Sequence, residues 1–92
     1  MIRGFRHRGL KRLYERGDPS RVRADQADRI ALALADLDDA RKPSDLDLPG
    51  YRLHPLKGDR NGFWSISISG NWRIVFRFDD GDVYDVELVD YH

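Results

Sequence analysis

The sequence contains no cysteine, and none of its apolar runs is long enough to span a membrane. Without cysteine, neither a disulfide framework nor a thiolate metal site can form. A reducing, cytoplasmic setting is therefore the simplest expectation. A membrane-spanning helix needs about 20 consecutive apolar residues, so no membrane association is expected. The first eight residues are basic, but no apolar region follows them, so they do not predict a signal peptide.

The chain also has no net charge, because its 16 Lys/Arg balance its 16 Asp/Glu. A neutral total argues against strong non-specific binding of nucleic acid. The charges are nevertheless unevenly distributed along the chain. Residues 1–23 hold eight Lys/Arg and two acids, residues 51–78 hold five and one, and residues 79–92 hold six acids and no Lys/Arg. The basic segments therefore permit a local site for an anionic ligand.

The length of 92 residues predicts a single domain, residues 1–92. Two helices are expected in its first half. Leu10, Leu13 and Tyr14 have the spacing of one helical face, and Gly17 is placed to end that helix. A longer helix is expected from Asp25, a plausible N-cap, to about residue 40. The apolar stripe of the longer helix consists of Ala27, Ile30, Ala31, Leu34 and Leu37.

After residue 50, the period of the apolar residues changes from 3.6 to 2, which predicts strands. The alternating segments are residues 51–56, 64–68, 72–78 and 84–88, and residues 1–5 could add a short edge strand. The predicted class is therefore α+β, with two N-terminal helices packed on a twisted antiparallel sheet.

The turns between these strands decide which residues face each other. A two-residue loop at 70–71 would place the apolar sets of its strands on opposite faces, because a one-residue slip inverts every side chain. A three-residue loop at 69–71 aligns Ile68 with Trp72 and is preferred. The same reasoning pairs Trp72 with Leu88. This register brings the last residues of the chain beside the turn at 69–71.

Several residues that can bind phosphate or transfer protons converge in this arrangement. Tyr91 and His92 would lie next to Asn71 and Arg73, with Asp90 placed to orient a neighbour. The remaining candidates are His54 on its strand and Lys57 in the loop that follows. Each is individually more typical of an ordinary surface residue than of a functional site.

Together these residue types suit RNA cleavage without a metal. A base must take the proton from the 2′-OH, cationic groups must hold the phosphate, and an acid must protonate the 5′-oxygen. A metal site is disfavoured, because the chain has three histidines, no cysteine and no His-x-x-x-His spacing. No Gly-rich phosphate loop precedes a helix, and we expect no cofactor.

Five segments of the chain resemble the HigB-type toxins of the RelE superfamily, also known as the plasmid maintenance system killer family. They are residues 2–11 (IRGFRHRGLK), 48–58 (LPGYRLHPLKG), 62–65 (GFWS), 70–74 (GNWRI) and 90–92 (DYH). The resemblance implies a RelE-like fold of the microbial-ribonuclease type. It also implies a type II toxin that cuts mRNA in the ribosomal A site and is neutralised by a HigA-type helix-turn-helix antitoxin. Toxin and antitoxin together would repress their own operon, so the toxin would reach operator DNA only through the antitoxin.

In such toxins, the cleavage site is formed by residues matching His54, Lys57, Asn71, Arg73, Asp90, Tyr91 and His92. We expect Arg73 and Lys57 to bind the scissile phosphate. His92 and His54 are candidates for proton transfer, and His92 is the better one. Tyr91 would stack on or orient the RNA. Asp90 and Asn71 would position their neighbours, and the assignment of base and acid stays open.

Two other functions remain as alternatives. The neutral net charge is compatible with a weakly active or inactive homologue that acts mainly as the antitoxin's partner and co-repressor. A generic binder of single-stranded nucleic acid would need a continuous basic groove with interleaved aromatics, and the acidic residues 79–92 disfavour it. The basic helix near the N-terminus would serve either the ribosome or an acidic antitoxin segment.

Overall fold

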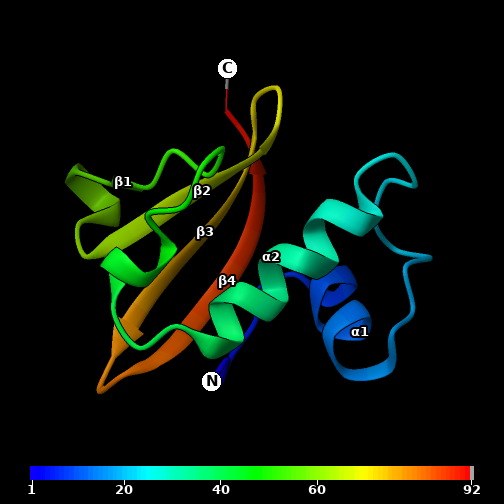
Figure 1. Ribbon diagram of the computed structural model, residues 1–92, viewed down its shortest axis with the longest axis horizontal. Helices are drawn as coiled ribbons and strands as arrows, with labels where there is room; N and C mark the ends of the chain where they lie inside the picture. The colour runs from blue at the N-terminus through cyan, green and yellow to red at the C-terminus, as the bar shows by residue number, and fades with distance from the viewer. Residues whose placement is uncertain (92) are drawn as a thin grey trace.

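A computed structural model describes residues 1–91 of the chain (Figure 1). His92 lies outside the described residues. The helices are α1 (Arg8–Arg16) and α2 (Ala27–Asp39), and two short 3₁₀ turns are η1 (Pro43–Leu46) and η2 (Gly58–Arg60). The strands are β1 (His54–Pro55), β2 (Phe63–Ser69), β3 (Trp72–Asp79) and β4 (Asp82–Asp90).

The first helix has the predicted position, and the second begins later than predicted. Gly17 ends α1 in the left-handed conformation, with φ 66°, and its N–H bonds to carbonyls of the last turn. Asp25 does not cap α2, because its carboxylate forms an ion pair with Arg23 at 3.0 Å. Gln26 occupies the N-cap position instead and makes no side-chain capping bond.

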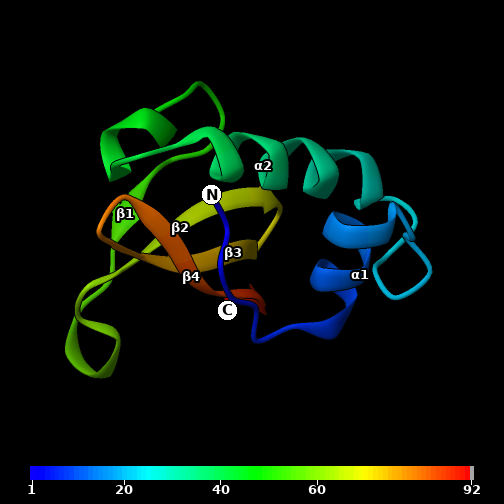
Figure 2. The same ribbon diagram turned by 90° about the horizontal axis from the view of Figure 1, so that it is seen from below.

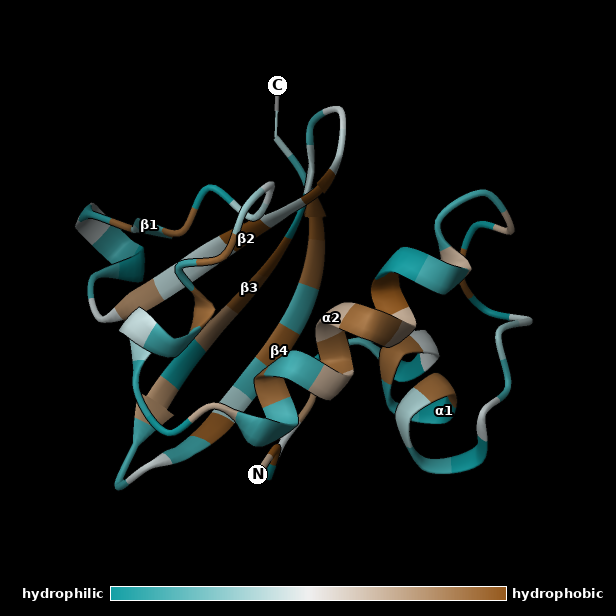
Figure 3. Ribbon diagram, in the orientation of Figure 1, coloured by the Kyte–Doolittle hydropathy of each residue, from teal (hydrophilic) through white to brown (hydrophobic). Residues whose placement is uncertain are grey.

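The core lies between α2 and one face of the sheet, as Figures 2 and 3 show. The residues of α2 that are buried there are Ile30, Ala33, Leu34 and Leu37, so Ala33 takes the place predicted for the exposed Ala31. The sheet residues that are buried in this core are Ile66, Ile68, Ile74, Phe76, Val83 and Val86. Val75 and its neighbour Ser65 are also buried but do not belong to this core. This packing leaves the opposite, outer face of the sheet for the polar alternates of the strands.

The strands form one antiparallel sheet in the order β1-β2-β3-β4. Between β2 and β3, the loop has two residues and not the predicted three, because Ser69 pairs with Trp72. An irregularity between Ser67 and Ser69 then shifts the register by one residue, so that Ile66 faces Ile74. The bulge restores the alignment of the apolar faces that a two-residue loop alone would have lost.

The register between β3 and β4 differs from the prediction. Trp72 pairs with Asp90 and not with Leu88, and Asp79 pairs with Asp82 across a two-residue turn. A second irregularity accommodates an extra residue at Asp85, which has φ 56°. The extra residue changes which residues point inward, so that Val83 is buried where Tyr84 was expected.

The edges of the sheet are shorter than predicted. Of residues 51–56, only His54 and Pro55 form a strand, which agrees with the restriction of proline to edge positions. Residues 1–5 form no regular strand, but Ile2 and Phe5 make isolated parallel bridges to Val83 and Val86 of β4. The N-terminal segment therefore covers the edge of β4. None of the helices within residues 1–91 is both long and apolar enough to cross a bilayer.

Asp38 joins three segments of the fold. Its carboxylate accepts hydrogen bonds from the Tyr14 hydroxyl at 2.6 Å and from the Ile2 amide at 3.0 Å. The bond from Tyr14, followed by that from Ile2, lowers the pKa of the Asp38 carboxyl. The same bond, with burial, raises the pKa of Tyr14 to about 12. The ionised carboxylate and the neutral phenol therefore stabilise the folded state together.

We expect Tyr14→Phe to lower the free energy of unfolding by about 2 kcal/mol at pH 7, the contribution of a hydrogen bond to a charged group. Because the pKa of Asp38 is lowered in the folded state, this contribution is full above the unfolded pKa and is lost as the pH falls through the folded pKa. Because the pKa of Tyr14 is raised, the contribution also declines above about pH 10. Urea denaturation across the pH range measures it, and a pH-independent difference would contradict the assignment.

Candidate functional site

A pocket of about 310 Å³ opens on the outer face of the sheet. It is lined by His54, Leu56, Ser65, Arg73 and Tyr91. These residues come from β1, β2, β3 and the positions just after β1 and β4, so three strands and the segment that follows β4 contribute to one surface. The period-2 alternation of the strands places their polar side chains here, opposite the apolar core.

Arg73 is the arginine that lines this pocket. Its Nη1 donates a hydrogen bond to the Ser65 hydroxyl at 3.2 Å. Two further arginines of the neighbouring surface are paired with acids, since Arg77 lies 2.7 Å from Asp85 and Arg60 lies 3.4 Å from Glu87. Within residues 1–91, Arg73 forms no such salt bridge. Its planar guanidinium therefore suits a bidentate contact with a phosphate group.

The end of β4 lies beside the turn between β2 and β3, as Figure 1 shows. The Tyr91 N–H donates to the Asn71 carbonyl at 2.8 Å. The predicted proximity of these two residues is confirmed, although the pairing of β3 with β4 is displaced from the predicted one. The guanidinium carbon of Arg73 lies 6.0 Å from the centroid of the Tyr91 ring, at the limit of a cation–π contact. Asp90 precedes Tyr91 and faces Trp72 across the sheet.

The structure brings some of the remaining candidates to the pocket. His54 lies opposite Ser65 and lines the pocket with it. Lys57 is exposed and does not line the pocket. It directly follows Leu56, which does line it. His92 follows Tyr91 in the sequence and lies outside the described residues.

Ser65 is the member of the site that sequence reasoning missed. Only 1% of its surface is exposed, and it holds the Arg73 guanidinium. The alternation along the strands places Ser65 on the same face as Arg73, so the sequence pattern did indicate that the two could meet. A serine that alternates with apolar residues on a strand is, however, usually exposed to solvent. Ser65 lies between His54 of β1 and Val75 of β3, so strands flank it on both sides.

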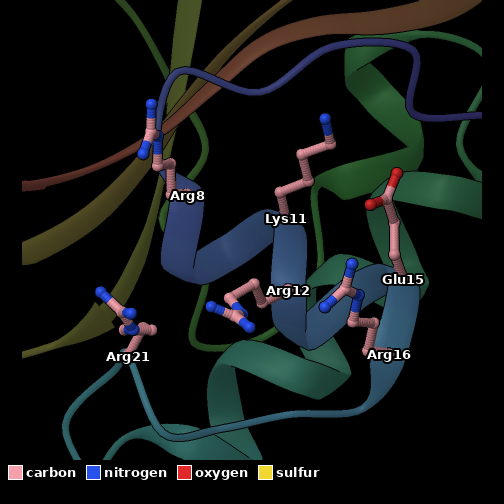
Figure 4. A pocket seen from close by; sticks show the side chains of 6 residues that line it. All are labelled: Arg8, Lys11, Arg12, Glu15, Arg16 and Arg21. Carbon is pink, nitrogen blue, oxygen red and sulfur yellow. The ribbon is translucent and has the colours of Figure 1, made fainter.

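A second hollow, of about 340 Å³, lies on α1 and is strongly cationic (Figure 4). We call it the α1 groove. Its lining residues are Arg8, Lys11, Arg12, Glu15, Arg16 and Arg21. Arg8, Arg12 and Arg16 recur every four residues and therefore share one face of the helix. Figures 1 and 2 place α1 at the end of the molecule away from β1.

Glycine at position 9 allows the chain after α1 to approach the groove. A Cβ at Gly9 would lie 2.7 Å from the Arg21 carbonyl oxygen, closer than real contacts allow. The absence of a side chain therefore lets Arg21 lie against the start of α1. Arg12 forms a salt bridge with Asp18, with its Nε 3.5 Å from the carboxylate.

The fold has a solved counterpart. The chain superposes on a chain of the YoeB-YefM complex from Staphylococcus aureus with a TM-score of 0.64 and 17% sequence identity. The match covers 100% of this chain and 98% of the other. The protein thus has the α+β RelE-like fold of the microbial-ribonuclease type, with two N-terminal helices on an antiparallel sheet.

The family follows from the sequence. Residues 3–92 match the model of the HigB-like toxins, described as the RelE-like toxin of the type II toxin–antitoxin system HigB. The chain is also 49% identical to Endoribonuclease HigB of Proteus vulgaris over 92 residues, which cover both chains completely. It belongs to the HigB-like family of RelE-like toxins.

Proposed function

We propose that this protein is a toxin that acts as an endoribonuclease and cleaves mRNA in the ribosomal A site, which stops translation in the cytoplasm. The observation that carries the proposal is the outer-face pocket, in which Arg73 lies beside His54 and Tyr91 and forms no salt bridge with an acid of residues 1–91. The full-length likeness to an endoribonuclease supports the same activity.

The reaction that suits this pocket is attack of the 2′-oxygen on the neighbouring phosphorus. The new bond joins O2′ to phosphorus, and the bond from phosphorus to O5′ breaks, which leaves a 2′,3′-cyclic phosphate. Arg73 and Lys57 would bind the phosphate and stabilise its added charge. His92 and His54 are the candidates for proton transfer, and His92 is the better one. Tyr91 would stack on or orient the RNA.

The positions of Asp90 and Asn71 suit supporting roles. Asn71 holds the backbone of Tyr91 through its carbonyl, and Asp90 lies next to Tyr91 at the end of β4. Catalysis also requires the 2′-oxygen to be aligned with the breaking bond, and orientation alone can supply several kcal/mol. We infer that the ribosome provides this alignment.

The α1 groove is our candidate for contacts with ribosomal RNA, because five cations against one acid suit a phosphate backbone. We expect the double variant Arg8→Gln/Lys11→Gln to weaken ribosome binding and to reduce its salt slope by about 1 per residue removed. The kcat of cleavage should stay unchanged. Arg29→Gln removes an exposed cation of α2 that lies outside the α1 groove and is the matched control.

Binding titrations between low and physiological salt measure this effect. An unchanged slope would contradict the assignment of the groove to RNA. If the double variant instead lost binding to the antitoxin at full ribosome affinity, the groove would serve an acidic antitoxin segment.

An antitoxin partner follows from membership of a toxin–antitoxin family, and the solved counterpart is itself described as a two-protein complex. We propose that the partner is of the HigA type, with a helix-turn-helix domain. The toxin would then reach operator DNA only through the antitoxin.

The proposal is tested by inducing the chain alone in a bacterial host and mapping the 5′ ends of cellular mRNA. We expect growth arrest with new ends inside translated codons. Normal growth without new ends would contradict the proposal and favour the alternative in which the chain acts only as the antitoxin's partner and co-repressor.

A further inference from the structure

Gln26 is a buried polar residue with no place in the proposed chemistry. Only 2% of its surface is exposed, and it lies at the N-cap of α2 without capping the helix through its side chain. Its Nε2 donates instead to the hydroxyl of Ser69, 43 residues further along the chain, at 2.9 Å. Its Oε1 is buried and has no hydrogen-bond partner within the described part of the chain. Burying an unpaired carbonyl destabilises a fold, so stability alone does not explain this residue.

Ser69 is the last residue of β2 and starts the turn that supports the end of β4. It pairs with Trp72 across the two-residue turn, just beyond the bulge in β2. The turn residue Asn71 then accepts the Tyr91 N–H at 2.8 Å. A short series of contacts therefore runs from the start of α2, through the turn, to the residue whose ring lies over Arg73.

We propose that Gln26 is a positioning residue that fixes the turn at residues 70–71, so that Asn71 holds Tyr91 over Arg73. This role rests on the proposed function in so far as it concerns catalysis. The bulge in β2 interrupts the ladder next to the turn, so the ladder alone holds the turn less completely. The bond from Gln26 adds a tie between the turn and the start of α2.

Three variants and one control variant separate this role from a purely structural one. Gln26→Leu keeps the volume but removes the donor, and Ser69→Ala removes the acceptor. Ser69→Thr keeps a hydroxyl that can accept the bond from Gln26 and should retain function. Ile30→Val shortens a core side chain of the same helix and is the control for lost stability alone.

We expect Gln26→Leu and Ser69→Ala each to lower the kcat of RNA cleavage by about tenfold to a hundredfold with KM unchanged, as small misplacements of reacting groups do. Hydrogen exchange of the Tyr91 amide should speed up in both, while that of the β3 core amides stays slow. The double variant should be no worse than either single one, because the two residues act through one bond.

Unchanged exchange at Tyr91 in both variants would overturn the proposal, and so would an equal effect of Ile30→Val on kcat. Exchange at Tyr91 is measurable whether or not the chain cuts RNA. A wild-type chain without cleavage would therefore overturn the proposed function, while the exchange data would still decide whether Gln26 positions Tyr91.

Discussion

Replacing Arg73 by alanine is expected to abolish growth arrest and to lower the rate of RNA cleavage by about a hundredfold to a thousandfold, the effect of removing one donor to a developing charge. Arg73 is half-buried in the outer-face pocket and is oriented by Ser65. No acid within residues 1–91 neutralises it at salt-bridge distance. Its charge is therefore available to the phosphate, and the variant removes this cation from the pocket lining.

Two further variants define the role of Arg73. Arg73→Lys keeps the charge but loses the planar fork, so it should recover only part of the activity. Arg77→Ala removes a neighbouring arginine of β3 that already pairs with Asp85 and should retain nearly full activity. Cleavage rates of the purified variants, with circular dichroism to verify folding, measure these effects. A folded Arg73→Ala variant that still arrests growth would refute the phosphate role.

Replacing His92 by alanine is expected to lower the rate of cleavage by about a hundredfold or more, which is the usual contribution of a general acid or base. His92 follows Tyr91, whose backbone is held beside the turn by Asn71. An imidazole titrates near neutral pH and can serve as either acid or base. The pH–rate profile should therefore lose one of its two limbs in this variant.

His54→Ala is the matched control for His92. His54 lines the same pocket from β1 but is exposed at the edge of the sheet. We expect a smaller loss from this variant, with both limbs of the pH–rate profile retained. A larger loss in His54→Ala than in His92→Ala would reverse the assignment of the principal proton-transfer group.

Much of the fold could be predicted from the period of the apolar residues. Gly17 marks the end of α1, and the alternation in residues 64–68 and 72–78 gives strands that the structure confirms. The bulges could not be predicted, because a two-residue turn with a bulge gives the same alignment of Ile66 with Ile74 as a longer loop without one. Two different backbones therefore satisfy one sequence pattern.

The candidate site was predictable where it depends on neighbouring strands and not where it depends on distant contacts. The approach of Tyr91 to Asn71 follows from the hairpins, and it survived an incorrect register because both registers bring the end of β4 to the same turn. The bond from Gln26 to Ser69 joins segments that no local pattern relates. The same is true of Arg21, whose contribution to the α1 groove depends on its packing against Gly9.

Dependence of cleavage on the ribosome can be measured by mixing the purified chain with an mRNA, either free or bound to bacterial ribosomes with an empty A site. We expect cleavage within the A-site codon only when the ribosome is present, and a 2′,3′-cyclic phosphate on the upstream fragment. Equal cleavage of free mRNA, or no cleavage on the ribosome by a chain that binds it, would contradict a ribosome-dependent endoribonuclease.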